Sequence, residues 1–361
     1  MTTQTLDQAK TEAFAGQMIG MLNGALTTLM VSVGHRTALF DQMAAMPPST
    51  SEQIASATGL NERYVREWLG NMTTARVVEH DAAKGTYWLP AEHAASITRA
   101  AGPGNLATMA EFLSQMGLVE DGVVEAFERG GGVPYSGFPK FQQQMAALSA
   151  QIFDATLLEA TLPLVPGLKD RLAAGIDVAD IGCGQGHAIN LMGETFPTSR
   201  FVGYDFSEEG VGVGRAEAKE MGLSNAKFEQ KDVTALGVKE AYDFIAAFDS
   251  IHDQAQPRKV LKGIYEALRP GGTFLMVDIA ADSTHAGNME HPMAPAFYAI
   301  STFHCMTVSL ALGGEGLGTM WGEQKARELL AEAGFRGVEI KHVEGDIMNA
   351  YYVCGKQVVS R

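Results

Sequence analysis

The sequence predicts an α/β protein in which a mainly helical N-terminal half precedes a doubly wound parallel sheet. Three observations carry this prediction. Residues 7–130 show helical patterning, apolar runs alternate with helical segments from Gly175 onward, and glycines occupy every second position after the first of those runs. Because such sheets bind ligands at the carboxyl ends of their strands, the functional residues are expected there.

The N-terminal half contains a helix-turn-helix pattern followed by a hairpin. Ser51 is the candidate N-cap of the first helix, and Gly59 is the turn residue. Val77–Glu79 and Thr86–Leu89, joined by residues 81–85, are expected to form the two strands of a wing. The positions expected to face the core are Ile54, Leu60, Val65 and Leu69.

The charge of this half argues against a DNA-binding role. Residues 1–165 carry 9 Lys and Arg against 16 Asp and Glu, and the whole chain of 361 residues has a net charge of −15. A domain that binds DNA normally presents a basic face. We therefore expect residues 1–165 to serve dimerisation and to cover the substrate, and residues 166–361 to form the second domain. The expected partners are a second copy of the chain and a small molecule, and neither nucleic acid nor a membrane.

Two features bear on the compartment. Met18–Gly34 carries no charge over 17 residues, near the lower limit for a membrane span, but its glycine, asparagine and threonine content favours a buried helix or a subunit interface. The cysteines Cys183, Cys305 and Cys354 are odd in number, lie far apart and match no zinc spacing. They indicate reduced thiols in the cytoplasm and no metal site.

The second half shows seven candidate strands, most of which are separated by helices. Two of these helices are Pro257–Leu268 and Glu323–Ala333. Arg269–Gly272 is expected to turn the chain into the fifth strand. No helix separates the last two strands, so we expect them to pair as an antiparallel hairpin at one sheet edge. The candidate strands are Asp177–Ile181, Arg200–Tyr204, Ala226–Glu229, Tyr242–Phe248, Thr273–Ile279, Val338–Val343 and Ala350–Gly355.

The first two strands end in a pattern typical of a nucleoside-cofactor site. Gly182, Gly184 and Gly186 leave no Cβ between the backbone and a ligand, and Asp205 at the end of the second strand is placed to accept hydrogen bonds from a ribose diol. A dinucleotide fingerprint needs its third glycine one residue later, where this chain has His187. The spacing therefore favours another cofactor.

The D-x-G-x-G-x-G form starting at Asp180 resembles motif I of class I S-adenosylmethionine methyltransferases. The resemblance implies S-adenosyl-L-methionine as cofactor, S-adenosyl-L-homocysteine as product and a Rossmann-like methyltransferase sheet. It places Asp205 on the ribose and Asp232 on the adenine amino group. The full set of implied cofactor contacts is Asp180, Gly182, Gly184, Gly186, Asp205, Phe206, Asp232, Val233, Phe248, Asp249 and Ser149.

Over residues 15–355 the chain resembles the two-domain small-molecule O-methyltransferases of plants and bacteria, and more closely a set of actinobacterial winged-helix methyltransferases. The histidine of an H-D dipeptide after the fourth strand is the general base of the plant enzymes, and His252 occupies that place, followed by Asp253. Methyl transfer is an in-line displacement, so the enzyme aligns the acceptor and removes its proton. A histidine with a pKa near 6.5 suits that task.

The chain departs from the plant pattern around this base. Gln254 follows where the plant enzymes carry tryptophan. Of their two orienting acids, Asp278 can stand for the first, while the second falls at Met320. His252 is therefore expected to be aided by Asp278 or Asp253.

The acceptor pocket is expected from the insertion between the fifth strand and the last long helix. Its methionine and aromatic side chains predict a ligand pocket, with ordinary core as the competing interpretation, and glycines 313, 314, 316 and 318 suggest a loop that closes over a small ligand. His304 is a reserve base. Cys305 is interpreted as a pocket thiol and not as a nucleophile, because His304 is the only basic residue next to it and adjacent side chains on a strand point apart. The acceptor-lining candidates are Tyr135, Met145, Tyr298, His304, Met306 and Trp321.

Three functional hypotheses remain open at this point. The first is methyl transfer to a small-molecule hydroxyl or thiol with His252 as general base. The second is S-methylation of small thiols or sulfide without an essential base, because thiols titrate near neutrality unaided. The third is a cofactor-sensing regulator that uses the winged helix.

Overall fold

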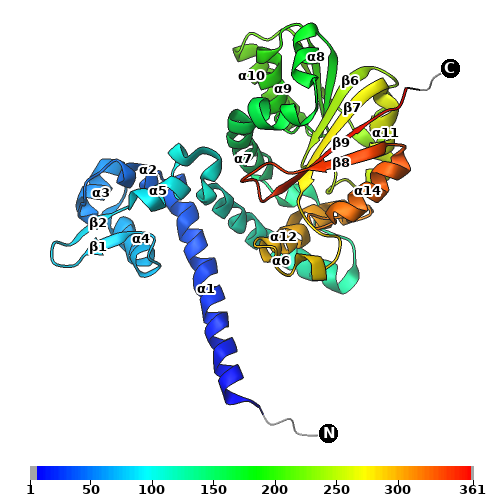
Figure 1. Cartoon of the computed structure of the whole chain (residues 1–361). Coiled ribbons are helices and arrows are strands. Elements are labelled where there is room, and N and C mark those ends of the chain that lie inside the picture. Colours follow the sequence, from blue (N-terminus) through cyan, green and yellow to red (C-terminus); the bar gives the residue numbers. More distant parts are fainter. Residues whose placement is uncertain (1–5, 359–361) are drawn as a thin grey trace. The chain divides into compact units, whose positions relative to one another are not determined.

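The computed structural model describes residues 6–358 and divides into two compact units, one up to Ser114 and one from Gln115 (Figure 1). We refer to them as the N-terminal unit and the sheet unit. The domain boundary that we expect after residue 165 from the sequence stays a prediction.

The N-terminal unit is mainly helical, and its hydrophobic core is centred on Trp68 and Phe40. The wing strands pair antiparallel, with Glu79 opposite Trp88. The elements are α1 (Gln8–Arg36), α2 (Leu39–Ala44), α3 (Ser51–Thr58), α4 (Glu62–Thr74), β1 (Glu79–Asp81), β2 (Thr86–Trp88), α5 (Ala91–Ile97), η1 (Arg99–Gly104) and η2 (Leu106–Glu111).

The predicted helix-turn-helix is present as α3 and α4, with one correction at its start. The N-cap of α3 is Thr50, whose hydroxyl accepts from the Gln53 amide in a capping box, whereas Ser51 is the first helical residue and bonds Glu62. Gly59 ends α3 at φ 68°, as expected of the turn residue. The predicted core positions Ile54, Val65 and Leu69 are buried, and Leu60 packs against them.

Helix α1 presents an apolar surface to solvent along most of its length. The exposed side chains include Ile19, Leu22 and Leu26, each 60% exposed. By length and composition this helix could cross a membrane, which for a single helix near the N-terminus is weak evidence. The expectation of a buried helix was wrong for α1 within the described chain, and the interface interpretation stays a prediction.

The sheet unit carries a seven-stranded sheet in the order β5-β4-β3-β6-β7-β9-β8. The first five strands in this order, from β5 across to β7, are parallel. Strand β9 lies antiparallel between β7 and β8, which confirms the expected doubly wound sheet with a terminal hairpin. The strands are β3 (Asp177–Ile181), β4 (Arg200–Asp205), β5 (Ala226–Gln230), β6 (Tyr242–Phe248), β7 (Leu268–Ile279), β8 (Arg336–Lys341) and β9 (Asn349–Gly355).

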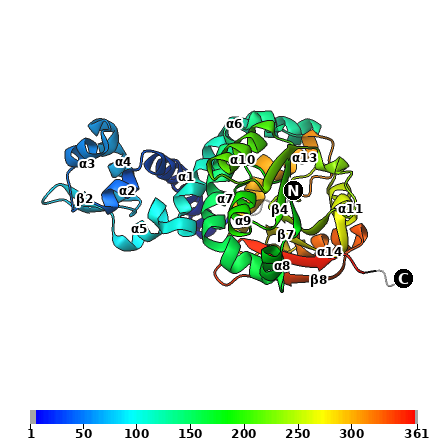
Figure 2. The ribbon, with the colours of Figure 1, turned by 90° about the horizontal axis from the view of Figure 1, so that it is seen from above.

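Helices cover both faces of this sheet, with α9 and α10 on one side and α11 and α14 on the other (Figure 2). Each side has its own apolar core because the strand residues alternate between them. The helices are α6 (Phe112–Arg129), α7 (Phe141–Thr156), α8 (Leu168–Ala174), α9 (His187–Thr195), α10 (Glu208–Glu220), α11 (Pro257–Ala267), α12 (Ala294–Ile300), α13 (Met306–Ala311) and α14 (Gly322–Ala333). Shorter helical turns are η3 (Tyr135–Gly137), η4 (Leu157–Thr161), η5 (Leu162–Leu164), η6 (Val233–Ala235), η7 (Ala286–Asn288) and η8 (Ser301–Cys305).

Several boundaries differ from the sequence-based expectation: β8 spans Arg336–Lys341 and not Val338–Val343, and β1 spans Glu79–Asp81 and not Val77–Glu79. Strand β7 already begins at Leu268, because the expected turn residues run along β6 through a bulge between Tyr242 and Phe244. The insertion that was expected to supply a loop or strand is largely helical, as α12, η8 and α13, and η8 is a π-helix.

Candidate active site

The glycine turn after β3 needs its three glycines for different reasons. All three have positive φ, between 55° and 75°. A Cβ on Gly182 would lie 2.5 Å from Ser250, and one on Gly186 would lie 2.1 Å from the ring of Phe228. A Cβ on Gly184 would meet no atom closer than the Gln142 amide oxygen at 4.0 Å. Gly184 is therefore the glycine that faces open space, while the other two allow the turn to pack.

Asp205 is the carboxylate that holds this turn. Its Oδ2 accepts from the Gly184 amide at 2.8 Å, and its Oδ1 accepts from the Ser207 amide at 2.8 Å. Burial raises the pKa of the carboxyl, although these backbone donors oppose the rise. Each carboxylate oxygen can accept a second hydrogen bond, so binding of a ribose hydroxyl is compatible with the observed contacts.

Two further acids at these strand ends, the buried Asp180 and the half-buried Asp249, each have a buried oxygen without a partner. Burial, with Asp205 adding to it, raises the pKa of Asp180 to about 8, and Oδ1 of Asp180 has no hydrogen-bond partner. Asp249 has a positive φ of 48°, an unpartnered Oδ1 and a pKa that burial raises to about 7. Backbone strain at a non-glycine residue is typical of functional sites.

These acids fit the cofactor expected from the sequence. S-adenosylmethionine carries positive charge on its sulfonium and its amino group, and an uncompensated buried carboxyl is stabilised by a cationic ligand. Within residues 6–358 no group of three or more His, Cys, Asp or Glu side chains is arranged to hold a metal ion.

The remaining predicted cofactor residues border the same end of the sheet with weaker evidence. Phe206 is 49% exposed, and its ring centroid lies 4.9 Å from that of Tyr135. Asp232 is exposed and caps η6 through Thr234, whereas Val233 is buried in the core. Phe248 packs edge-on to Phe153, and Ser149 is partly exposed on α7. Their roles toward a cofactor stay predictions.

The structure selects Asp278, rather than Asp253, as the partner of His252. The Nδ1 atom of His252 lies 2.8 Å from Oδ1 of Asp278, and both side chains are buried. Burial alone would lower the pKa of the imidazole, but the Asp278 carboxylate and the Cys305 thiol outweigh it and raise the pKa well above its ordinary value.

The place of the missing second acid is occupied by a different kind of group. Met320 packs in a small apolar cluster, and the next residue, Trp321, donates its indole N–H to Oδ1 of Asp278 at 3.0 Å. The same oxygen also accepts from the Ile279 amide. Sequence reasoning placed Trp321 in the acceptor wall and missed this contact, because nothing in the local pattern shows which way the indole points.

Asp253 is engaged by a residue from a distant segment. The Tyr135 hydroxyl donates to Oδ2 of Asp253 at 2.6 Å. Burial raises the pKa of Asp253 to about 6, while His252 and Tyr135 oppose the rise. Tyr135 follows a run of glycines in which Gly130 and Gly131 have positive φ, and a Cβ on Gly132 would lie 2.0 Å from the Thr307 carbonyl.

His304 and Cys305 lie together in the π-helix η8, so the strand-based argument about their directions was wrong. Cys305 is buried and interacts with His252, which is the basic residue that sequence reasoning did not place beside it. His304 is enclosed by three aromatic rings, those of Tyr135, Phe138 and Phe141.

Three other acceptor candidates are not drawn together with this group by any described contact. The Tyr298 hydroxyl accepts from Nδ2 of Asn288 at 3.1 Å, and its ring packs in the apolar cluster around Phe297 and Met320. Met145 and Met306 are partly exposed on α7 and α13. The acceptor roles of Tyr298, Met145 and Met306 stay predictions.

Three of the four glycines of the insertion, Gly314, Gly316 and Gly318, pack onto protein, whereas a Cβ on Gly313 would meet nothing within 4 Å. The Gly318 amide donates to the His252 carbonyl at 3.1 Å, and a Cβ there would lie 2.1 Å from the Ser301 hydroxyl. A Cβ on Gly314 would lie 2.5 Å from Cα of Ala255. Through Gly314 and Gly318, this segment therefore packs against the loop that follows β6.

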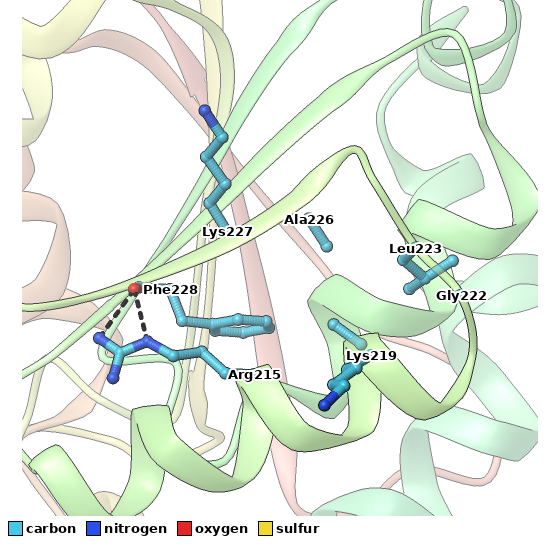
Figure 3. A pocket seen from close by; sticks show the side chains of 8 residues that line it. Arg215, Lys219, Gly222, Leu223, Ala226, Lys227 and Phe228 are labelled. Atoms are coloured by element: carbon cyan, nitrogen blue, oxygen red, sulfur yellow. Dashed lines mark hydrogen bonds between the residues drawn. The ribbon is translucent and has the colours of Figure 1, made fainter.

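A separate pocket lies at the other end of the glycine turn, between α10 and the edge strand β5 (Figure 3). Its cavity measures about 390 Å³, and Arg215 closes one side by donating to the Phe228 carbonyl. The base and its partner acid are absent from its walls. The lining residues are Arg215, Ala218, Lys219, Gly222, Leu223, Ala226, Lys227 and Phe228.

Comparison with protein families finds two matches along the chain. Residues 25–99 match the model of the Rv2258c-like winged HTH domain, and residues 172–341 match a model described as methyltransferase domain.

Curated relatives match parts of the chain. A demethylmenaquinone methyltransferase of Lactococcus lactis subsp. lactis is 24% identical over 198 residues, which are 51% of this chain and 75% of that protein. A malonyl-[acyl-carrier protein] O-methyltransferase of Bacillus cereus is 24% identical over 148 residues, 40% of this chain and 48% of that protein. The chain thus spans about half the length of the second relative.

Solved structures match over nearly the whole chain. The mitomycin 7-O-methyltransferase MmcR has a TM-score of 0.71 at 17% identity, covering 97% of this chain and 100% of that one. Human N-acetylserotonin methyltransferase, solved with S-adenosylmethionine, has a TM-score of 0.70 at 16% identity, covering 99% and 100%. At these identities the likeness establishes the fold.

Proposed function

We propose that this chain, which matches a winged HTH domain and a methyltransferase domain, transfers the methyl group of S-adenosylmethionine to a hydroxyl or thiol of a small molecule, with His252 as the general base. The observation that carries the proposal is the buried 2.8 Å contact between Nδ1 of His252 and Asp278. A carboxylate in that position fixes the tautomer of the imidazole.

Bound S-adenosylmethionine supplies an electrophilic methyl group on a positively charged sulfonium. Asp180 and Asp249 would face its cationic groups, Gly184 and Asp205 its ribose, and Asp232 its adenine. Phe206 and Val233 would frame the adenine, with Phe248 and Ser149 at the methionyl end. These assignments rest on the strand-end positions and on the unpartnered carboxyl oxygens described above.

The proton of the acceptor goes to Nε2 of His252. With Nδ1–H donated to Asp278, Nε2 carries the lone pair. S-adenosylmethionine, when bound, would supply the methyl group, while Nε2 of His252 would hold the proton that the acceptor hydroxyl releases. Asp278 stabilises the imidazolium that results. A positively charged cofactor beside His252 would disfavour that imidazolium and so lower the pKa of the base.

The experiment that tests this proposal measures S-adenosylhomocysteine release against phenols and enols on one side and sulfide and small thiols on the other. His252→Ala should lose on the order of 10²–10⁴-fold in kcat with hydroxyl acceptors. The control is His80→Ala, in the wing of the N-terminal unit. Turnover confined to thiols that survives His252→Ala would support the alternative without an essential base.

Absence of turnover with every acceptor, despite cofactor binding, would favour the regulator hypothesis. A gel-shift assay on genomic fragments at physiological salt tests it directly. The arginines of α4 are paired with acids, Arg63 with Glu67 and Arg66 with Glu62, which leaves little positive charge for a phosphate backbone.

We also propose that the chain forms a homodimer through α1. From Ala13 to Gly34 this helix carries no charged side chain, and Cβ atoms on Gly16, Gly20 and Gly24 would meet nothing within 4 Å. A second copy offers an uncharged apolar helix of the same kind, which can approach closely over the glycines. Gly20→Leu should shift light scattering from the mass of a dimer toward that of a monomer. Vesicle binding by the wild type without dimerisation would favour a membrane contact instead.

We place the protein in a reducing, cytoplasmic compartment. Cys183, Cys305 and Cys354 are all free thiols, and two of them are buried. Unpaired cysteines of this kind are typical of proteins kept in a reducing environment.

A further inference from the structure

His304 is a buried polar side chain without a hydrogen-bond partner. It lies in η8, is 4% exposed, and neither its Nδ1 nor its Nε2 atom contacts a donor or acceptor of the described chain. Buried polar atoms in proteins are nearly always hydrogen-bonded, and an unmet one costs free energy. The residue therefore calls for a partner from outside the chain.

The surroundings of His304 are aromatic and leave its nitrogens unsatisfied. The ring of Phe141 stacks on the imidazole with centroids 3.5 Å apart and planes at 14°. Phe138 and Tyr135 pack edge-on, at 4.7 and 5.5 Å. The one hydroxyl among these rings, that of Tyr135, is already donated to Asp253. These rings favour a flat aromatic ligand beside the imidazole.

His304 also adjoins the proposed base. It precedes Cys305, which interacts with His252, and the charge of His252 acts on His304 directly. Burial, with His252 adding to it, lowers the pKa of His304 to about 3. The imidazole of His304 is therefore neutral, offers one N–H donor and one lone pair, and is a weaker base than that of His252.

We propose that His304 is a specificity-determining residue of the acceptor site, where it hydrogen-bonds a second polar group of a flat aromatic acceptor, next to the group that His252 deprotonates. The acceptor class is then an aromatic ring with two neighbouring oxygen functions, such as an ortho-dihydroxy or ortho-hydroxycarbonyl compound. The inference rests on the proposed methyltransferase function. It replaces the hypothesis of a reserve base with that of a neutral recognition group.

The test compares catechol with phenol as acceptors for the wild type, His304→Phe and His304→Gln. Phenylalanine keeps the ring and removes both nitrogens, while glutamine keeps a donor and an acceptor. The wild type should prefer catechol in kcat/KM. His304→Phe should reduce this preference roughly 10- to 100-fold, as expected for one buried hydrogen bond. His304→Gln should restore part of it, and the pH profile of kcat should keep its midpoint in both variants.

Equal losses with both acceptors, or a shifted pH midpoint in His304→Phe, would overturn the inference. Calorimetric binding of catechol and phenol in the presence of S-adenosylhomocysteine separates this result from failure of the proposed function. If neither compound is methylated but catechol binds tighter than phenol to the wild type only, the recognition role stands and the reaction is wrong. If both compounds bind the wild type and His304→Phe equally, the recognition role is wrong whatever the reaction.

Discussion

The cofactor half and the acceptor half of the candidate site solve binding in opposite ways. The cofactor half, at the ends of β3, β4 and β6, holds buried acids, and Asp180 and Asp249 have oxygens without partners. The acceptor half, built from η3, α7 and η8, holds aromatic rings around His304, a neutral group without partners. One half is suited to a cation and the other to a flat uncharged molecule.

This difference shows how one buried region can hold charged groups on one side and uncharged groups on the other. Acids that would repel one another gain from a positively charged methyl donor, so that half is stabilised mainly by its ligand's charge. The acceptor half has no charge to offer and must recognise shape and hydrogen bonds. His252 lies where the two meet, with Asp278 on one side and Cys305 on the other. The four predictions below test this comparison.

The largest effect is expected from Asp278→Asn. The amide can donate to Nδ1 of His252, which moves the ring proton to Nε2 and removes the lone pair needed for the acceptor. We expect kcat with hydroxyl acceptors to fall on the order of 10²–10⁴-fold. Asp253→Asn is the matched control, because Asp253 bonds Tyr135 and not the imidazole. Similar losses in both variants, measured by S-adenosylhomocysteine release, would contradict the assignment.

Gly186→Ala and Gly184→Ala separate packing from cofactor contact within one turn. Both glycines have positive φ, but only at Gly186 does a Cβ collide with the Phe228 ring. We expect Gly186→Ala to lower the free energy of unfolding by about 2–4 kcal/mol and Gly184→Ala by about 1 kcal/mol. Gly184→Ala should instead weaken cofactor binding. Urea unfolding and cofactor titration provide the two readouts, and reversed rankings would show that the turn is oriented differently.

Trp321→Phe tests whether the indole supports the base through Asp278. Phenylalanine preserves the packing but removes the 3.0 Å donor to Oδ1. Without this donor, the Asp278 carboxylate attracts the imidazolium of His252 more strongly, so the pKa of His252 should rise. The acid limb of the kcat profile should move to higher pH, and the rate at neutral pH should fall up to about 10-fold. An unchanged profile with a reduced melting temperature would show a packing role only.

The smallest effect, on stability, is expected at His187. Its side chain contacts α10 beside the cofactor half and α7 of the acceptor half. Its Nδ1 lies 2.6 Å from Glu217 on α10, and its Nε2 lies 2.9 Å from Asp154 on α7. Burial opposes protonation, but the two carboxylates outweigh it and raise the pKa of His187 in the folded chain. The stabilisation is therefore complete below the unfolded pKa and is lost as pH rises through the folded one.

Because His187 is partly exposed, we expect about 1 kcal/mol or less from this pair of contacts. Urea unfolding of the wild type and His187→Gln across the range from acidic to mildly basic pH measures it. The difference in unfolding free energy between the two proteins should shrink as pH rises. A difference that grows with pH would contradict the sign of the shift.

The cofactor half could be predicted from the sequence because its residues follow one another along the chain. Strand, glycine turn and acid are local patterns, and the parallel order of strands brings their ends together. The location of Gly182, Asp205 and His252 follows from that logic. The winged pattern was equally local, and its errors are small shifts: Ser51 for Thr50 at a cap, and Val77–Glu79 for Glu79–Asp81 in the first wing strand.

The acceptor half could not be predicted in the same way. Its contacts join segments more than a hundred residues apart, such as Tyr135 with Asp253, and no local pattern specifies them. Apolar and glycine-rich residues in the insertion suggested a loop, but η8 is a π-helix, whose extra residue changes the face presented by every side chain after it. The role of Trp321 depends on side-chain direction and is equally non-local.

The π-helix η8 determines which side chains are presented by the helix that follows it. A π-turn holds one residue more than an α-turn, so loss of a single residue between Ser301 and Cys305 would restore the α repeat. The helix after it would then rotate by about 100° relative to the helix before it. Gain or loss of one residue at this point would therefore change which side chains the following helix presents, while the strands and the glycine turn stay as they are.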